Sequence, residues 1–250
     1  MRIPFIAGNW KMNITTENSN FPEETYIAAL VENKLDNVEV CVFPPFTHLG
    51  LLSAMADGQI NIGGQDVSKN LSGAHTGDIS ADCLIDVGAS YVLAGHSERR
   101  RDHNESDSVV CAKTQASLSV GLNVVVCIGE SDAQNKASDT IKVLTKQLDD
   151  SIPQGTSADR IVVAYEPVWS IGTGRVPKME QIEMIHLSLR EHLATSRSAD
   201  FADGVRIVYG GSVKPENAKD ILGLANVDGA LVGGASLASE DFIAIMNGVK

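Results

Sequence analysis

Aromatic residues make up only 5% of this 250-residue chain, and its four cysteines include no Cys-x-x-Cys pair. Such widely spaced cysteines favour buried free thiols in a reducing compartment over a disulfide framework or a zinc site. No apolar run approaches the roughly 18 residues of a membrane helix, and the N-terminal apolar stretch is too short for a signal peptide. These absences predict a soluble, cytoplasmic protein without a membrane partner.

Basic residues are also scarce. Lysine and arginine number 20 against 32 acidic residues, which gives a formal net charge of -12. An acidic protein repels nucleic acid and anionic membrane surfaces, so neither is expected as a partner. Any anionic substrate therefore needs a local positive pocket.

Short apolar runs alternate with stretches of helical spacing such as Ile182, Ile185, Leu189 and Leu193. This alternation predicts parallel strands joined by helices, and eight such units fit one (β/α)8 barrel domain over residues 1–250, with an open doubly wound sheet as the weaker alternative. We expect Asp149–Ser151 to begin a surface loop. The predicted strands are Phe5–Ala7, Val38–Val42, Ile60–Gly63, Tyr91–Ala94, Asn123–Ile128, Ile161–Ala164, Val205–Tyr209 and Gly229–Val232.

Ligands bind at the carboxyl ends of the strands in either architecture, and the residues found there bear on chemistry. Glu166 follows the sixth run and is a candidate base, although a helix-capping carboxylate would explain it too. Lys11, beside Asn9 after the first run, is either a solvated charge or the cation that an anionic substrate needs.

His96 follows the fourth run, where it could be a buried ring bonded only to backbone. If Ser97 caps a helix that begins there, the positive helix end lies near the ring, lowers its pKa and favours neutral imidazole. The run Arg99–Arg101 is expected to form ion pairs on a helix face.

Glycine pairs end the seventh and eighth runs, at Gly210–Gly211 and Gly233–Gly234. Tight turns alone would explain them, but barrel enzymes commonly bind phosphate after these two strands. No His, Asp and Glu set has metal spacing, so we expect no metal and no cofactor. Cys127 is expected to be a packed thiol rather than a nucleophile.

Five motifs in order make the chain resemble the triosephosphate isomerase family over essentially its whole length. They are Gly8–Asn13, Gly95–Arg100, Tyr165–Gly174, Tyr209–Val213 and Gly229–Leu237.

The resemblance implies a metal-free isomerase that interconverts dihydroxyacetone phosphate and glyceraldehyde 3-phosphate in glycolysis and gluconeogenesis. Glu166 would be the base, His96 the neutral electrophile, and Lys11 with Asn9 would orient the substrate. Residues 168–176 would close over the site as a lid. Backbone at four residues would hold the phosphate: Gly172, Ser212, Gly233 and Gly234.

The resemblance also implies a homodimer in which Thr76, on the long segment 65–80, touches the partner's site; a floppy surface loop is the alternative. The sequence departs from the family pattern at four residues. Ser170 could change lid kinetics through a local hydrogen bond, and Asp78 could weaken the dimer. The other two are Ile14 and His75. A pentose-phosphate epimerase on the same barrel and a barrel that binds without turnover are the rival functions.

Overall fold

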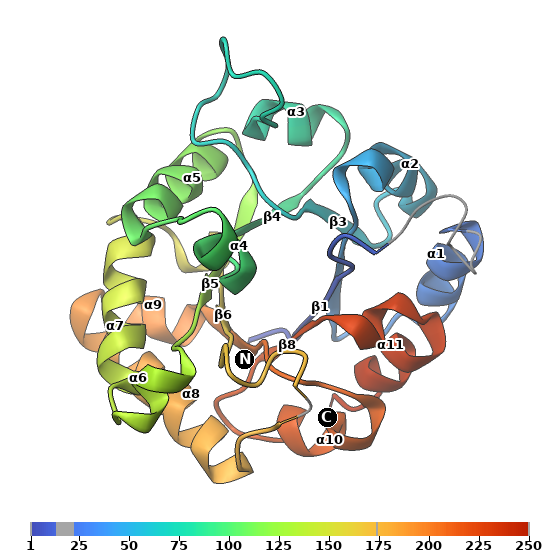
Figure 1. The fold of residues 1–250 in the computed structure, drawn as a ribbon. Helices are drawn as coiled ribbons and strands as arrows, with labels where there is room; N and C mark the ends of the chain where they lie inside the picture. The colour runs from blue at the N-terminus through green and yellow to red at the C-terminus, as the bar shows by residue number, and fades with distance from the viewer. Residues whose placement is uncertain (1, 14–22, 174, 250) are drawn as a thin grey trace.

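The computed structural model describes residues 2–13, 23–173 and 175–249. Eight parallel strands close into a barrel in chain order, because β1 pairs with both β2 and β8, and helices surround the barrel (Figure 1). This confirms the (β/α)8 barrel and shows that the open sheet was wrong. The strands are β1 (Phe5–Asn9), β2 (Glu39–Phe43), β3 (Asn61–Gly64), β4 (Tyr91–Ala94), β5 (Asn123–Ile128), β6 (Ile161–Tyr165), β7 (Arg206–Tyr209) and β8 (Gly229–Val232).

The helices occupy the stretches between the strands, as the apolar spacing predicted. They are α1 (Glu23–Glu32), α2 (Phe46–Ala56), α3 (Ala81–Asp86), α4 (Ser97–Asp102), α5 (Asp107–Ser119), α6 (Asp132–Lys136), α7 (Thr140–Ser151), α8 (Met179–Ser196), α9 (Ala199–Gly204), α10 (Pro215–Leu222) and α11 (Ser239–Met246), with 3-10 helices η1 (Ala158–Arg160) and η2 (Gly234–Leu237).

Each strand buries both of its faces, which explains the near-continuous apolar runs. Alternate residues point into the barrel, where Phe5, Phe43 and Leu231 belong to one closed cluster. The others meet the helices in a second, larger cluster that includes Ile182 and Leu189 of α8. Packing on both sides fixes the barrel as a rigid support for the residues at its carboxyl end.

Five of the predicted strands, β1, β2, β3, β6 and β7, differ from the structure by one or two residues at an end, and one predicted loop is helical. β1 continues through Asn9, which pairs with Phe43 of β2, because backbone pairing extends the strand past its apolar residues. The acidic cluster Asp149–Ser151 was predicted to be a loop but forms the last turn of α7. Ser151 is fully buried, and its hydroxyl accepts a hydrogen bond from Arg100 at 3.2 Å, so a tertiary contact keeps this turn helical.

His186 of α8 is fully buried and packs edge-on against the ring of Tyr165, with ring centroids 5.8 Å apart. Burial lowers the pKa of His186 from its ordinary 6.5 to about 4. Between these two pH values the unfolded chain binds a proton at this ring that the folded chain does not. The folded state therefore loses stability as pH falls from 6.5 toward 4.

We predict that this one ring lowers the free energy of unfolding by about 2 kcal/mol between pH 7.5 and pH 5. Urea unfolding of wild type and His186→Phe at both pH values checks it, since phenylalanine keeps a planar ring but cannot bind the proton. Equal pH dependence in the two proteins would contradict the prediction.

Candidate active site

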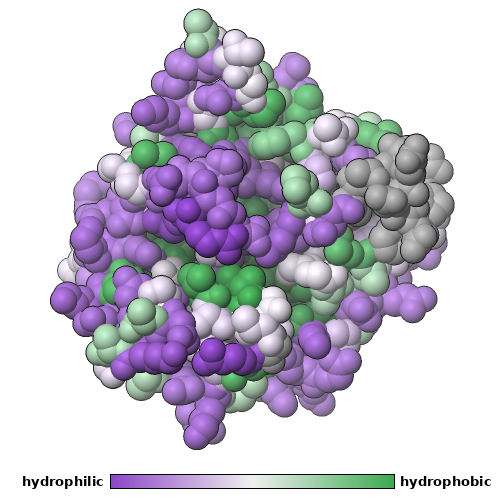
Figure 2. Space-filling view, in the orientation of Figure 1, coloured by the Kyte–Doolittle hydropathy of each residue, from purple (hydrophilic) through white to green (hydrophobic). Residues whose placement is uncertain are grey.

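A cavity of 460 Å³ lies at the carboxyl end of the barrel and contains every predicted catalytic and substrate-binding residue. In the space-filling view a hollow lies beside the hydrophilic side chains of α4 (Figure 2). A larger surface hollow of 710 Å³ lies between α5 and residues 153–157, but Arg160 is the one ionisable side chain among its lining residues. The lining of the 460 Å³ cavity includes Asn9, Lys11, His96, Glu166, Gly172, Ser212, Gly233 and Gly234.

Glu166 follows β6 directly and is held there by its own backbone, whose N–H donates to the carbonyl of Ile128 at 2.7 Å. Its side chain is 2% exposed. One carboxylate oxygen accepts from the backbone N–H of Ser97 at 3.0 Å, and the other lies 2.9 Å from His96 Nε2. The carboxylate therefore faces the imidazole of His96 and does not cap a helix of its own loop.

His96, not Ser97, is the N-cap of α4, and this part of the sequence prediction was wrong. The ring Nδ1 accepts from the backbone N–H of Glu98 at 3.3 Å, so the helix end holds the ring directly. A nitrogen that accepts a hydrogen bond carries no proton, which leaves Nε2 as the N–H that points at Glu166. The neutral ring that the sequence predicted is thus the tautomer that this geometry supports.

The pKa of His96 depends on its neighbours. Burial acts to lower the pKa of this ring, but the carboxylates of Glu166 and Glu98 together raise the pKa above its ordinary value. The sequence prediction of a lowered pKa considered the helix alone and is wrong for this arrangement. Burial likewise acts to raise the pKa of Glu166, but His96 and the Ser97 N–H outweigh it and lower that pKa, so the base is ionised at neutral pH.

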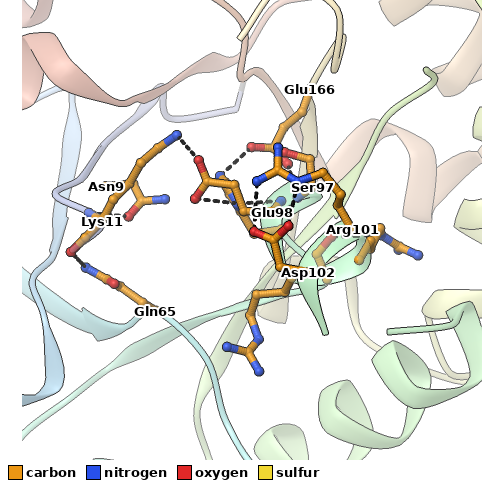
Figure 3. A network of polar contacts seen from close by, with 12 residues as sticks. Asn9, Lys11, Gln65, Ser97, Glu98, Arg101, Asp102 and Glu166 are labelled. Carbon is orange, nitrogen blue, oxygen red and sulfur yellow. Dashed lines mark hydrogen bonds and ion pairs between the residues drawn. The ribbon is translucent and has the colours of Figure 1, made fainter. Parts of the chain in front are cut away.

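Lys11 reaches the site in a strained conformation. Its φ is 53°, in the left-handed region that residues with a side chain rarely adopt. Its backbone N–H donates to the Asn9 side chain at 3.0 Å, and its carbonyl accepts from Gln65 at 2.8 Å. Its ammonium lies 2.6 Å from Glu98, toward which it points in Figure 3. These three contacts, with Asn9, Gln65 and Glu98, hold Lys11 in a backbone conformation that is unfavourable by itself.

Two of these contacting residues were not predicted to act at the site. Glu98 was included only within the motif Gly95–Arg100 and Gln65 only as the start of the segment 65–80, yet both contact Lys11. No sequence pattern links residues 54 and 87 positions apart, so only the closure of the barrel reveals these contacts.

The predicted phosphate residues line the same cavity, and Gly233 lies close to Lys11, since a Cβ added at Gly233 would be 3.6 Å from Lys11 Cε. Gly172 has φ 69°, which glycine adopts without strain, and Gly233 precedes the 3-10 helix η2. Free backbone N–H groups at such a helix end are suited to bind an anion.

Residues 168–176, the predicted lid, contact the rest of the barrel through Trp169 and through Arg175, whose guanidinium lies 3.5 Å from Asp132; Gly174 is outside the described residues. Trp169 Nε1 donates to the buried carboxylate of Glu130 at 2.8 Å, and the Arg175 guanidinium lies 4.8 Å from the Trp169 ring centre. The Ser170 hydroxyl donates to the Arg175 carbonyl at 2.5 Å. The local hydrogen bond expected of Ser170 is thus present, while its effect on lid kinetics stays a prediction.

Gly210 lets the backbone of the loop after β7 approach the base. A Cβ added at this position would lie 2.8 Å from Glu166 Cγ, closer than real Cβ contacts. We predict that Gly210→Ala displaces the carboxylate and lowers kcat by about 10²-fold, as a misplacement of about 1 Å does in other enzymes. Steady-state kinetics check it against Gly50→Ala on α2, whose Cβ would make only a 3.7 Å contact with Val87. Equal kcat values in the two variants would contradict the prediction.

The remaining predicted residues lie outside this cavity. Thr76 is exposed on the segment 65–80, which projects beyond the ring of helices next to α3 (Figure 1). The segment is not floppy at its base, since Ser68 N–H donates to the Ile79 carbonyl at 2.7 Å and the Ser68 hydroxyl to Asp78 at 3.0 Å. His75 is exposed, and Ile14 lies outside the described residues.

Other side chains behave as their sequence context indicated. The run Arg99–Arg101 forms ion pairs, including Arg99 with Asp66 at 2.9 Å and Arg100 with Asp107 at 2.6 Å. Cys127 is a buried free thiol whose pKa is raised, chiefly by burial and then by the Glu166 carboxylate.

In the described part of the chain, no three His, Cys, Asp or Glu side chains gather as a metal site, and no helix is long and apolar enough to span a membrane.

Comparison with known proteins gives a consistent result over the whole chain. The sequence profile described as Triosephosphate isomerase matches residues 4–249. The triosephosphate isomerase of Ruegeria pomeroyi is 47% identical over 251 residues, covering 100% of this chain and 98% of that protein. That of Ruegeria sp. strain TM1040 is 52% identical over 238 residues, 94% of either chain. The crystal structure of triosephosphate isomerase from Bartonella henselae superposes with a TM-score of 0.90 at 39% identity, covering 98% of each chain.

Proposed function

The chain belongs to the triosephosphate isomerase family, and we propose that Glu166, His96 and Lys11 carry out the family's reaction at the carboxyl end of the barrel. The reaction interconverts dihydroxyacetone phosphate and D-glyceraldehyde 3-phosphate, a step of glycolysis and gluconeogenesis. The observation that carries the assignment of residues is the single cavity in which a carboxylate, an imidazole, an ammonium and two glycine-bearing loops converge. Family membership removes the epimerase and the non-catalytic barrel as rivals.

Glu166 takes a proton from the carbon beside the substrate carbonyl and returns it to the former carbonyl carbon. The hydroxyl proton of the first carbon passes to the former carbonyl oxygen by way of His96 Nε2, so the two oxygens exchange their roles. No substrate atom fits between Glu166 Oε1 and His96 Nε2 at 2.9 Å, so the carboxylate moves away from the ring when substrate binds. The charge that raises the pKa of His96 then leaves the ring, and burial acts to lower that pKa instead. His96 thereby stays neutral and donates its Nε2–H to the enediolate oxygen, together with the Lys11 ammonium.

Asn9 holds the backbone of Lys11 and lies in the same cavity, so it orients both the cation and the substrate. Backbone at Gly172, Ser212, Gly233 and Gly234 holds the phosphate. Closure of residues 168–176 excludes water from the enediolate, which would otherwise expel phosphate. Each step is a proton transfer, so the mechanism uses neither a metal ion nor a cofactor.

We further propose a cytoplasmic homodimer of this one-domain chain. Thr76 lies exposed on a projecting segment whose base is clamped, and Met12, which follows Lys11 in the chain, is 95% exposed. A second copy of the chain would cover these residues and place Thr76 near the partner's Asn9 and Lys11.

A coupled assay of both triose phosphates, with and without a chelator, tests the function. Rapid turnover that the chelator leaves unchanged supports the proposal, and no turnover in well-folded protein would refute it.

Sedimentation tests the dimer. Thr76→Arg is expected to shift the protein toward the mass of one 26.6 kDa chain and to lower its activity, since a bulky cation cannot enter the partner's site. Thr195→Arg, an equally exposed change on α8, is the control. Wild-type protein that sediments as a single chain with full turnover would contradict the dimer.

A further inference from the structure

A second lysine lies in the active-site cavity. Lys214 lines it with Ser212, Gly233 and Gly234, the residues proposed to hold the phosphate. It follows the loop after β7 and precedes α10, two positions after Ser212, whereas Lys11 follows β1 and lies next to Glu98 and Gly233. Lys11 and Lys214 are the two lysines among the residues that line the cavity, and no arginine lines it.

The two lysines differ in how much of their charge is available. The Lys11 ammonium lies 2.6 Å from Glu98, so a neighbouring carboxylate offsets part of its charge. Lys214 is exposed and forms no ion pair with any side chain in the described ranges. Its charge therefore acts on whatever approaches the cavity.

The loop that carries Lys214 is fixed. Asn217 accepts from the backbone N–H of Lys214 at 2.8 Å and donates to the carbonyl of Ser212 at 3.0 Å. One side chain thus ties the position of Lys214 to that of the phosphate-binding residue two positions earlier. The Lys214 side chain therefore extends from a fixed backbone beside the residues proposed to hold the phosphate.

The net negative charge of the protein means that an anionic substrate needs a local cation such as Lys214. A phosphate dianion must enter a chain of formal net charge -12, at a site that already contains the carboxylate of Glu166. Neutral backbone N–H groups can bind the anion but exert little attraction at a distance, because dipole fields fall off faster than those of a charge. A free cation beside these groups draws the anion in at a range set by ionic strength.

We infer that Lys214 is a further substrate-recognition residue, which attracts and holds the phosphate dianion of the triose phosphate while taking no part in proton transfer. The inference rests on the proposed function. It assigns to a side chain a part of phosphate recognition that the backbone groups alone do not supply.

Steady-state kinetics of wild type, Lys214→Gln and Lys219→Gln at low and high salt test the inference. Lys219 is an exposed lysine of α10 that does not line the cavity, so its loss changes net charge equally. At low salt Lys214→Gln is expected to lower kcat/KM about 5- to 10-fold, through KM, with the gap closing toward 1 M salt, where the screening length falls to about 3 Å. Inorganic phosphate, used as an inhibitor, is expected to bind this variant more weakly by the same factor.

The phosphate-free aldehyde glyceraldehyde separates recognition from structure. Its turnover is expected to be the same in Lys214→Gln as in wild type, since it brings no dianion. Kinetics of Lys214→Gln that match those of Lys219→Gln at every salt concentration would overturn the inference, and so would an equal loss on glyceraldehyde, which would show a structural role in the loop. Absence of turnover in wild type would instead refute the proposed function.

Discussion

Replacing Glu166 by glutamine is expected to lower kcat by about 10³- to 10⁴-fold, the upper range for loss of a positioned general base. The amide has the same size but cannot accept the proton from carbon. It also fits its present neighbours poorly, because the Ser97 N–H and the His96 Nε2–H both donate to the carboxylate. One end of the amide is itself a donor, so either orientation places two donors face to face.

Steady-state and single-turnover assays of both triose phosphates measure this loss. Glu166→Asp is the matched comparison, since it keeps a base that is shorter by one methylene, and an intermediate loss is expected. Competitive inhibition by inorganic phosphate should be nearly unchanged in Glu166→Gln, because the phosphate end of the cavity is untouched. Retention of kcat within tenfold would remove Glu166 from the role of base.

Positions along the chain could be predicted from the sequence because strands that bury both faces are almost purely apolar. The predicted runs Tyr91–Ala94, Asn123–Ile128 and Gly229–Val232 coincide with β4, β5 and β8. Once the barrel closes, residues that follow successive strands must meet at one end, so Glu166 and His96 share a cavity although 70 positions separate them in the sequence.

What surrounds each side chain could not be predicted in the same way. The helix after β4 was located correctly, but the identity of its cap depends on the direction in which the His96 ring points. The pKa of that ring depends on a carboxylate 2.9 Å away, which comes from a different strand end. Sequence spacing predicts where elements lie, whereas pKa values depend on distances of a few ångströms between elements far apart in the chain.

Glu166 and His96, the proposed base and electrophile, control each other's charge. Glu166 in contact with His96 raises the pKa of the ring, and His96 with the Ser97 N–H lowers the pKa of the carboxylate. The pair is therefore stable with an ionised base while no proton is being transferred. Movement of the carboxylate toward a substrate carbon ends this mutual stabilisation, which leaves the base more basic and the ring more firmly neutral. Contact between the two groups thus keeps the carboxylate ionised before the reaction, and their separation gives each group the charge state and basicity that the proposed proton transfer needs.

The second large effect is expected from Lys11. We predict that Lys11→Met lowers kcat/KM by about 10³-fold or more, because removing one donor to a developing oxyanion costs about 10²- to 10³-fold in kcat and substrate binding weakens as well. Methionine is similar to lysine in length and is also unbranched, so the free-energy cost of the backbone conformation at φ 53° is the same in the variant. Kinetics with each triose phosphate measure the loss, and Lys11→Arg shows how much of it follows charge alone.

An indirect cause can be separated from a direct one. Lys11→Met leaves Glu98 without its partner, and Glu98 lies 3.6 Å from His96 Nδ1, where an unbalanced carboxylate would raise the pKa of the ring and oppose its neutral form. If that were the reason for the loss, Glu98→Gln in the same chain would restore activity. We expect the double variant Lys11→Met with Glu98→Gln to remain as inactive as Lys11→Met alone, because a neutral His96 cannot replace the ammonium that balances the charge of the enediolate. Recovery of the double variant to within about tenfold of Glu98→Gln alone would show that Lys11 acts through Glu98 and not on the substrate.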